Sequence, residues 1–322
     1  MNRSDRTDRR RERGTTGGSS SLRWTLLLVV PLGLAGAAVG WALAGNDPVQ
    51  DEAAVRAGAD LAGAIVLGLA ALPRLSVRLQ PRWRLLTVIA ALWTALEFTM
   101  LVLEAAEVQG IPAHRLSAPQ LGDYLSTASG GQIGIALLIG CGAVTAYSAF
   151  GFRSPDRATP DLVLVFTAVT LALRPITGHM SQQTFGSVLG AVHALAAAAW
   201  FGLLLALALT VRTRGEWAVL LPRFSQWALP LAATVTVTGV INALVHEHGL
   251  TPFVTTGYGR ILLAKTVILA ALLGLGWWLR RRWVPIAEDH RMSAESSLRR
   301  AIFEVLVMAV AFGLAGTLAV TA

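Results

Sequence analysis

Five side chains that are able to bind metal lie in or beside long hydrophobic stretches of this chain. They are His179, Met180, His193, His246 and His248. Imidazole is the commonest protein ligand for metal ions, and thioether sulfur prefers Cu(I). His193 lies inside an apolar run, where a polar group is expensive and usually faces the interior of a helix bundle. These residue types predict a site that accepts a metal cation.

A second set of residues is placed to support such a site or to line a path toward it. Glu97, Met100 and Glu104 follow an i, i+3, i+7 spacing and therefore share one helix face. Simpler interpretations stay open, in which Met100 only packs in the core and Arg174 neutralises the charge of Glu97. Trp200 lies seven residues after His193 on the same helical face, either as packing or as a partner for a cation.

The composition indicates that lipid surrounds most of the chain. Of 322 residues, 54% are hydrophobic and only 14% are charged, against about 25% charged in soluble domains. The net charge of +8 is spread between apolar runs, which argues against nucleic-acid binding. The single cysteine, Cys141, excludes an intrachain disulfide and a cysteine zinc cluster.

Nine apolar segments predict an all-α, polytopic transmembrane bundle. About 20 residues suffice to cross the hydrocarbon core, and a spanning segment must satisfy its own backbone hydrogen bonds. The count falls to eight if the first segment is a cleaved signal peptide or the short fifth segment is not a span. We place the segments at 23–45, 53–73, 85–106, 129–151, 161–176, 184–211, 225–246, 259–280 and 300–321.

The arginines predict the orientation, because most of the 27 basic residues fall in alternate loops. The positive-inside rule then places the amino terminus in the cytoplasm and the carboxyl terminus outside a bacterial plasma membrane. Five of the six histidines lie in the outer half in that orientation. We expect a disordered basic tail at 1–22, amino-terminal membrane helices at 23–176 and a second membrane domain at 177–322.

Several stretches resemble the copper resistance protein D family of bacterial integral membrane proteins. The resemblance covers about residues 176–322, and the chain has Leu203 where the family pattern has a second glycine after its tryptophan. A tight helix contact is therefore not expected there. The matching stretches are Gly178-His179, "HALAAAAWFGLLLAL" from His193, "PRFSQWAL" at 222–229, "TTGYGRILLAKTVILAALLGLG" at 255–276 and "LRRAIFEVLVMAV" at 298–310.

The resemblance implies copper uptake or tolerance and gives further residues possible roles. Tyr258 and Lys265 match the family pattern on the eighth segment, where Lys265 pairs with a carboxylate such as Glu97 or reaches outward to the interface. Glu304 follows an arginine pair, Arg299-Arg300, and is expected to form a local ion pair. No copper-binding extracytoplasmic domain is seen, so we expect a separate copper-delivery protein.

Three other functions remain as alternatives. A b-type haem electron-transfer protein would use His179 and His193, which lie ~21 Å apart along a helix, but no facing segment offers a matching pair. An intramembrane hydrolase would need a catalytic motif, and neither His-Glu-x-x-His nor Gly-x-Ser-x-Gly occurs, so we expect no enzymatic activity. The last alternative is a purely structural assembly partner.

Overall fold

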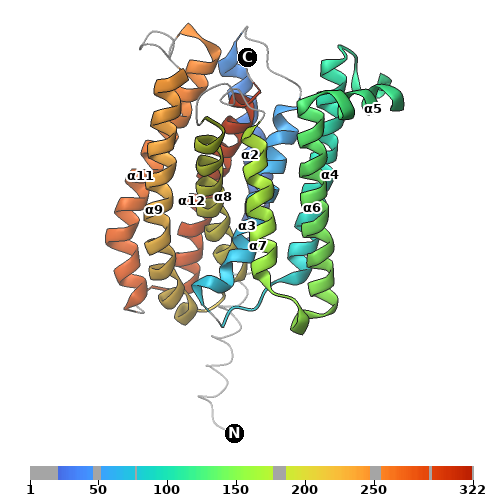
Figure 1. Cartoon of the computed structure of the whole chain (residues 1–322). Coiled ribbons are helices and arrows are strands. Elements are labelled where there is room, and N and C mark those ends of the chain that lie inside the picture. The colour runs from blue at the N-terminus through green and yellow to red at the C-terminus, as the bar shows by residue number, and fades with distance from the viewer. Residues whose placement is uncertain are drawn as a thin grey trace.

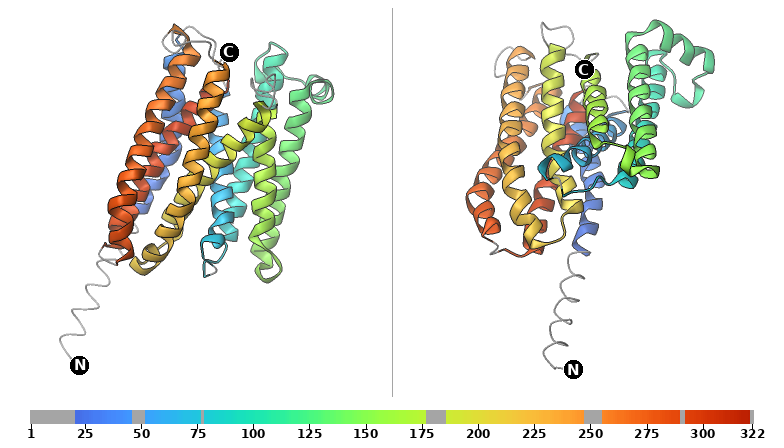
Figure 2. Two further views of the ribbon diagram at one scale, coloured as in Figure 1. Left: turned by 60° about the vertical axis from the view of Figure 1, so that its left-hand side comes forward. Right: turned by 60° about the horizontal axis from the view of Figure 1, so that its bottom comes forward.

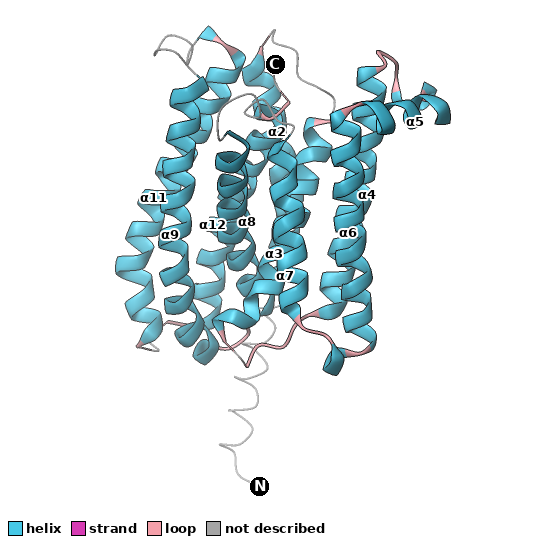
Figure 3. Ribbon diagram, viewed as in Figure 1, coloured by secondary structure: helices cyan, strands magenta, loops and turns pink. Residues whose placement is uncertain are grey.

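The structure is a computed structural model that describes residues 21–45, 52–76, 78–176, 186–246, 255–289 and 292–320. Helices make up nearly all of these residues, and no strand occurs among them (Figure 3). This confirms the predicted all-α bundle. Most of the predicted tail at 1–22 lies outside the described residues, and the division into two membrane domains stays a prediction.

Eight helices in the described part are long and apolar enough to cross a membrane. The first of these spans comprises residues 21–24, η1 and α2. The long helices are η1 (Thr25–Leu28) with α2 (Val29–Ala44), α3 (Ala53–Leu75), α4 (Trp83–Val108), α6 (Ser129–Arg153), α8 (Gly186–Thr210), α9 (Arg214–His246), α11 (Gly257–Glu288) and α12 (Ala294–Leu318). The chain is therefore a multi-pass membrane protein, as the hydrophobic segments predict.

The predicted fifth segment is the short apolar helix α7 (Pro160–Leu173), which continues into η4 (Arg174–Ile176). It packs against α3, α6 and α8 and runs through the bundle beside α6 (Figure 1). The first described helix begins at one end of the bundle and α12 finishes at the other (Figures 1 and 2). We call these ends the amino-terminal face and the carboxyl-terminal face. Termini on opposite faces fit nine passes, with α7 as the ninth.

Some helices extend beyond the apolar segments, and one short helix was not predicted. Helix α9 begins at Arg214 rather than near 225, and α12 begins at Ala294 rather than near 300. Charged residues such as Arg and Glu are good helix formers, so a helix continues where it leaves the lipid. The unpredicted helix, α5 (Ala118–Thr127), lies at the carboxyl-terminal face (Figure 1) and starts at a capping box formed by Ser117 and Gln120. The remaining short elements are η2 (Ala113–Arg115) and η3 (Pro155–Arg157).

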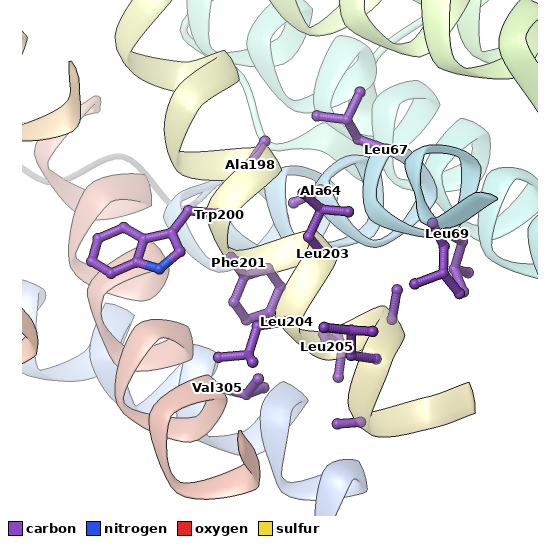
Figure 4. Packing of buried hydrophobic residues seen from close by; sticks show 14 of the residues in the cluster. Ala64, Leu67, Leu69, Ala198, Trp200, Phe201, Leu203, Leu204, Leu205 and Val305 are labelled. Carbon is purple, nitrogen blue, oxygen red and sulfur yellow. The ribbon is translucent and has the colours of Figure 1, made fainter. Parts of the chain in front are cut away.

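Helix α3 is the centre of the bundle. It packs against α2, α4, α7, α8 and α12, whereas α9 and α11 lie at the periphery. Its small and aliphatic side chains, including Ala64 and Leu67, meet Phe201 and Leu203 of α8 in the main hydrophobic core (Figure 4). The central position of α3 matters because its first two turns carry charged residues.

Glycine makes the closest helix contact in this core. A Cβ atom built on Gly202 would lie 2.0 Å from the Ala64 carbonyl oxygen, and one built on Gly68 would lie 2.0 Å from the Gly202 carbonyl carbon and oxygen. Helices α3 and α8 therefore touch through their backbones, as small residues permit in membranes. Leu203 does not prevent this contact, so our expectation of a looser contact near that residue was wrong.

Arginine side chains close the ends of neighbouring helices. The Arg260 guanidinium on α11 donates through Nε to the Leu43 carbonyl oxygen at 2.6 Å and through Nη2 to the Ala44 carbonyl oxygen at 3.0 Å. Arg223 on α9 donates through Nη1 to the Leu75 carbonyl oxygen at 2.6 Å. Ala44 and Leu75 end α2 and α3, so these bonds satisfy carbonyls that have no partner within their own helix.

We predict that Gly202→Ala lowers the thermal stability of the purified protein by several degrees, because a methyl group has no room between α3 and α8. Forcing extra volume into a packed core costs about 1–3 kcal/mol. Gly274→Ala on α11 is the control, since a methyl group at that position would meet nothing within 4 Å. Differential scanning fluorimetry in detergent measures both. Equal unfolding temperatures for the two variants would contradict the contact.

Candidate functional site

His193 is fixed by a hydrogen bond between two helices. Its Nδ1 atom lies 2.8 Å from the Thr238 hydroxyl on α9. That hydroxyl donates its own hydrogen to the Thr234 carbonyl oxygen at 2.6 Å, so it accepts from His193. The neutral ring therefore carries its hydrogen on Nδ1 and keeps a lone pair on Nε2. A histidine held in this way is typical of metal ligands, whose second nitrogen donates to an orienting group.

Lys265 on α11 is the charged residue whose influence reaches this ring. Its positive charge acts on His193, and the negative charge of Asp60 on α3 acts on Lys265. Lys265 forms no ion pair within the described residues, and Glu97 pairs with Arg174 instead, so the alternative in which Lys265 pairs with Glu97 is not seen there.

Glu97 forms an ion pair with Arg174, which confirms the alternative in which these two residues neutralise each other. The Arg174 Nη2 atom is ion-paired with Glu97 Oε1, and its Nε lies 3.3 Å from Asp60 Oδ1. The Trp93 indole N–H donates to the same Glu97 oxygen at 2.8 Å. Only 11% of the Arg174 side chain and 3% of the Glu97 side chain are exposed. The triad therefore joins α3, α4 and η4 inside the bundle.

These groups lie at a similar depth. His193, Asp60 and Lys265 are each about two turns inside α8, α3 and α11, counted from the carboxyl-terminal face. At 1.5 Å per residue, this places them ~10–12 Å below the helix ends. The sequence did not single out Asp60, although a carboxylate in the second turn of an otherwise apolar segment is a signal of its own.

Further acidic groups stand above this layer, where α3 and α4 reach the carboxyl-terminal face. The Tyr124 hydroxyl on α5 donates to Glu104 Oε2 at 3.4 Å. Burial, and then the carboxylates of Glu107 and Glu104, raise the pKa of Glu52 from its ordinary 4.5 to about 7. Glu52 precedes α3 and is only 4% exposed. The sequence pattern singled out Glu104, but it gave no sign of Glu52 and Tyr124, because these two residues lie outside the apolar runs.

Two other predicted residues are buried in the bundle. Met100 packs in the interior, in line with its interpretation as a core residue. Trp200 is also buried, and its Nε1 atom has no hydrogen-bond partner in the described part of the chain. Tyr258 lies near the start of α11, half-buried at the carboxyl-terminal face.

Most of the predicted ligands cannot be placed. His179, Met180 and His248 lie outside the described residues, and of His246, the last residue of α9, only the backbone is described. Among the described residues, no three His, Cys, Asp or Glu side chains stand together so as to hold a metal ion. The five-residue ligand set therefore stays a prediction, with His193 as its described member.

Glu304 differs from its predicted role. It lies on α12 with 4% of its surface exposed, and no ion pair to it occurs within the described structure. Arg299 instead pairs with Glu295 Oε1 at 3.3 Å, one turn back along the helix. Arg300 places its guanidinium carbon 5.9 Å from the centre of the Trp278 ring. The expected local ion pair of Glu304 is therefore wrong.

Comparison with protein families gives one match, to the family described as copper resistance protein D, over residues 218–318. The match runs from the first turns of α9 through α11 and α12. It confirms the predicted resemblance over the stretches at 222–229, 255–276 and 298–310. Residues 176–217, which include His193 and Trp200, lie outside this match.

A curated relative is similar to part of the chain. The "Copper transport protein CutJ" of Bacillus subtilis (strain 168) is 26% identical over 141 residues, which cover 40% of this chain and 24% of the relative. The chain thus aligns with about a quarter of that protein. No solved structure matches the chain significantly.

We predict that Arg174→Gln lowers stability by about 3–5 kcal/mol, because it leaves Glu97 buried without its counter-ion. Arg74→Gln is the matched control: Arg74 Nη2 lies 2.8 Å from Asp161 Oδ1, but their side chains are 63% and 49% exposed. An exposed pair contributes at most about 1 kcal/mol. Thermal unfolding in detergent compares the two, and similar losses would show that the buried triad is not a stabilising constraint.

Glu52 makes stability depend on pH in a defined direction. Because its pKa is raised in the folded protein, the folded state binds the extra proton and stability falls as the pH rises from about 4.5 through 7. Glu52→Gln should abolish that part of the decline and stabilise the protein at mildly alkaline pH. At mildly acidic pH, the variant and the parent should unfold at the same temperature. A Glu52→Gln melting profile parallel to that of the parent would refute this.

Proposed function

We propose that this chain is an integral plasma-membrane protein for copper handling, in uptake or tolerance, that binds copper on the extracytoplasmic side. The family match over α9, α11 and α12 supports a copper-related role. The similarity to a copper transport protein supports the same role. The family match covers α9, α11 and α12, so the roles of His193 and of the amino-terminal helices rest on their own geometry.

The 2.8 Å contact between His193 Nδ1 and the Thr238 hydroxyl is the observation that carries the proposal. Thr238 takes up the Nδ1 hydrogen, which leaves Nε2 as an unprotonated donor inside a membrane domain. We propose that Nε2 binds the copper ion, together with donors from His179, Met180, His246 and His248. Helix α8 begins and α9 ends at the carboxyl-terminal face, and these four residues lie next to those two helix ends in the sequence.

We propose that the carboxyl-terminal face is the extracytoplasmic one. The arginine bias supports this orientation, since the loops at the opposite face hold most of the basic residues. A copper ion would then reach His193 from outside, supplied by a separate delivery protein. The ion binds and moves without chemical conversion, so we propose no enzymatic activity.

The positive charge of Lys265 would weaken the binding of copper at His193. A cation bound there meets the positive charge of Lys265, which acts on the same ring. Asp60 offsets this repulsion, because its carboxylate acts on Lys265. We propose that the Asp60–Lys265 relation keeps the copper site weak enough for the ion to leave it, as conduction requires.

His193→Ala should reduce copper accumulation in cells and weaken Cu(I) binding by the purified protein more than tenfold, because it removes the donor atom. Thr238→Val should weaken binding by about 10–100-fold, the usual effect of losing the group that orients a ligand. His114→Ala is the control, since His114 is exposed on η2. Competition with a Cu(I) chelator measures binding. Unchanged affinity in both His193→Ala and Thr238→Val would refute the site.

A further inference from the structure

A groove of about 560 Å³ opens at the amino-terminal face, where α4 begins and where α6 and α8 end. Helices α4 and α6 pack side by side at one edge of the bundle (Figure 1), and both α4 and α8 pack on α3. Among the described residues that line the groove, three are arginines and none is acidic. The arginines are Arg82 and Arg84 at the start of α4 and Arg212 just beyond the end of α8.

These three arginine side chains have no anionic partner in the described part of the chain. All three are exposed, and the ion pairs formed by described arginines involve other residues. The nearby Glu216 accepts hydrogen bonds from the backbone N–H groups of Arg212 and Thr213 at 2.7 and 2.9 Å, so it caps the start of α9. The groove is therefore a concentration of positive charge that lacks a matching carboxylate.

A fourth arginine adds to this positive charge. The Arg23 guanidinium donates through Nη1 to the Leu209 carbonyl oxygen at 3.4 Å, which holds it at the end of α8. The positive charges of Arg212 and Arg82 act on Arg23 unfavourably, and the charge of Glu216 offsets only part of their effect. Cations gathered in this way create a local potential that raises the concentration of anions.

The start of α4 supplies neutral donors beside the arginines. Arg82 is the residue that precedes the helix, and no side chain caps the first turn. The first backbone N–H groups of a helix have no partner within it, and together with the helix dipole they attract anions such as phosphate. Trp83 also lines the groove with 7% of its surface exposed, and its indole N–H forms no hydrogen bond within the described residues.

The part of the groove that leads into the membrane is apolar. Leu85 and Val88 follow the arginines on α4, and Phe152 of α6 lines the same groove. Val88 is 58% exposed and Phe152 is 56% exposed, so acyl chains cover them in a bilayer. Val88 lies ~7–8 Å deeper than Trp83 at 1.5 Å per residue. A basic rim above an apolar wall fits a phospholipid better than a free phosphate ion.

We propose that this groove binds an anionic phospholipid, whose phosphate is held by Arg82, Arg84 and Arg212. One acyl chain lies along Leu85 and Val88. Guanidinium groups match phosphate oxygens with pairs of hydrogen bonds, and basic pockets between membrane helices are suited to such headgroups. A zwitterionic headgroup would also bring an ammonium group, and no described carboxylate lines the groove to receive it.

The bound lipid would hold together helix ends that come from different parts of the chain. Its headgroup contacts the start of α4 and the residue that follows α8, so it joins the edge formed by α4 and α6 to the rest of the bundle at the amino-terminal face. This role is independent of copper, because the groove lies at the face opposite to the one nearest His193.

Titration of the purified full chain with lipids, followed by native mass spectrometry, tests the site. Phosphatidylglycerol added to the detergent should bind more tightly than phosphatidylcholine. It should also raise the unfolding temperature by several degrees, because a ligand that binds only the folded state stabilises it. Inorganic phosphate at the same concentration should leave the unfolding temperature unchanged, since it cannot use the apolar wall.

Arg84→Gln and Arg212→Gln should each weaken phosphatidylglycerol binding about fivefold, the usual contribution of one basic residue near anionic lipid. Arg282→Gln on α11 is the matched control, since Arg282 is exposed at the same face and does not line the groove. It should leave the affinity unchanged. The substituted arginines are exposed, and equal unfolding temperatures of parent and variants in lipid-free detergent would confirm that the variants fold.

Four outcomes would overturn the site. The first is equal phosphatidylglycerol affinity in the parent and in the Arg84→Gln, Arg212→Gln double variant. The second is binding of phosphatidylcholine as tight as that of phosphatidylglycerol, which would show that the groove does not select charge. The third is full stabilisation by inorganic phosphate alone, which would indicate a site for a free anion. The fourth is an equal loss in Arg282→Gln, which would reflect net charge rather than this groove.

Discussion

The Arg174 guanidinium lies between Asp60 and Glu97. This ionic contact is the constraint on which the part of the bundle nearest the carboxyl-terminal face depends. Each of these ions is costly inside a membrane, and each is tolerable because the others are present. The triad joins α3, α4 and η4, and it sits where the short helix α7 ends. Because α3 is also the central helix, this ionic connection fixes the helix against which α8 packs.

Much of the fold could be predicted because lipid permits few solutions. Continuous apolar runs of about 20 residues must become helices, and the sequence predicts each of the long ones. The depth of His193 follows from its place within such a run. The match over residues 218–318 confirms the family resemblance on α9, α11 and α12, whereas the ligand set around His193 stays a prediction.

The ion-pair partners of the buried charged residues could not be predicted, because they depend on how the helices pack. Glu97 had two candidate cations, Arg174 and Lys265, and spacing along the chain does not distinguish them. The structure pairs Glu97 with Arg174 and brings Lys265 under the influence of Asp60. Glu304 shows the same limit, since an arginine one turn away was no guarantee of an ion pair. Helix α5 was missed because its stability comes from a cap rather than from an apolar run.

The arginines that bind the carbonyl oxygens at helix ends show that the basic residues have a second structural role. Lys265 is the single lysine among 27 basic residues. A planar guanidinium can hold two adjacent carbonyl oxygens at once, as Arg260 does at the end of α2, whereas an ammonium group is a point charge. Arg223, at the opposite face whose loops hold most of the basic residues, likewise fastens α9 to the end of α3. The same residues therefore serve both membrane topology and the contacts between helices. Lysine in their place would keep the positive charge but would lose the paired hydrogen bonds to carbonyl oxygens.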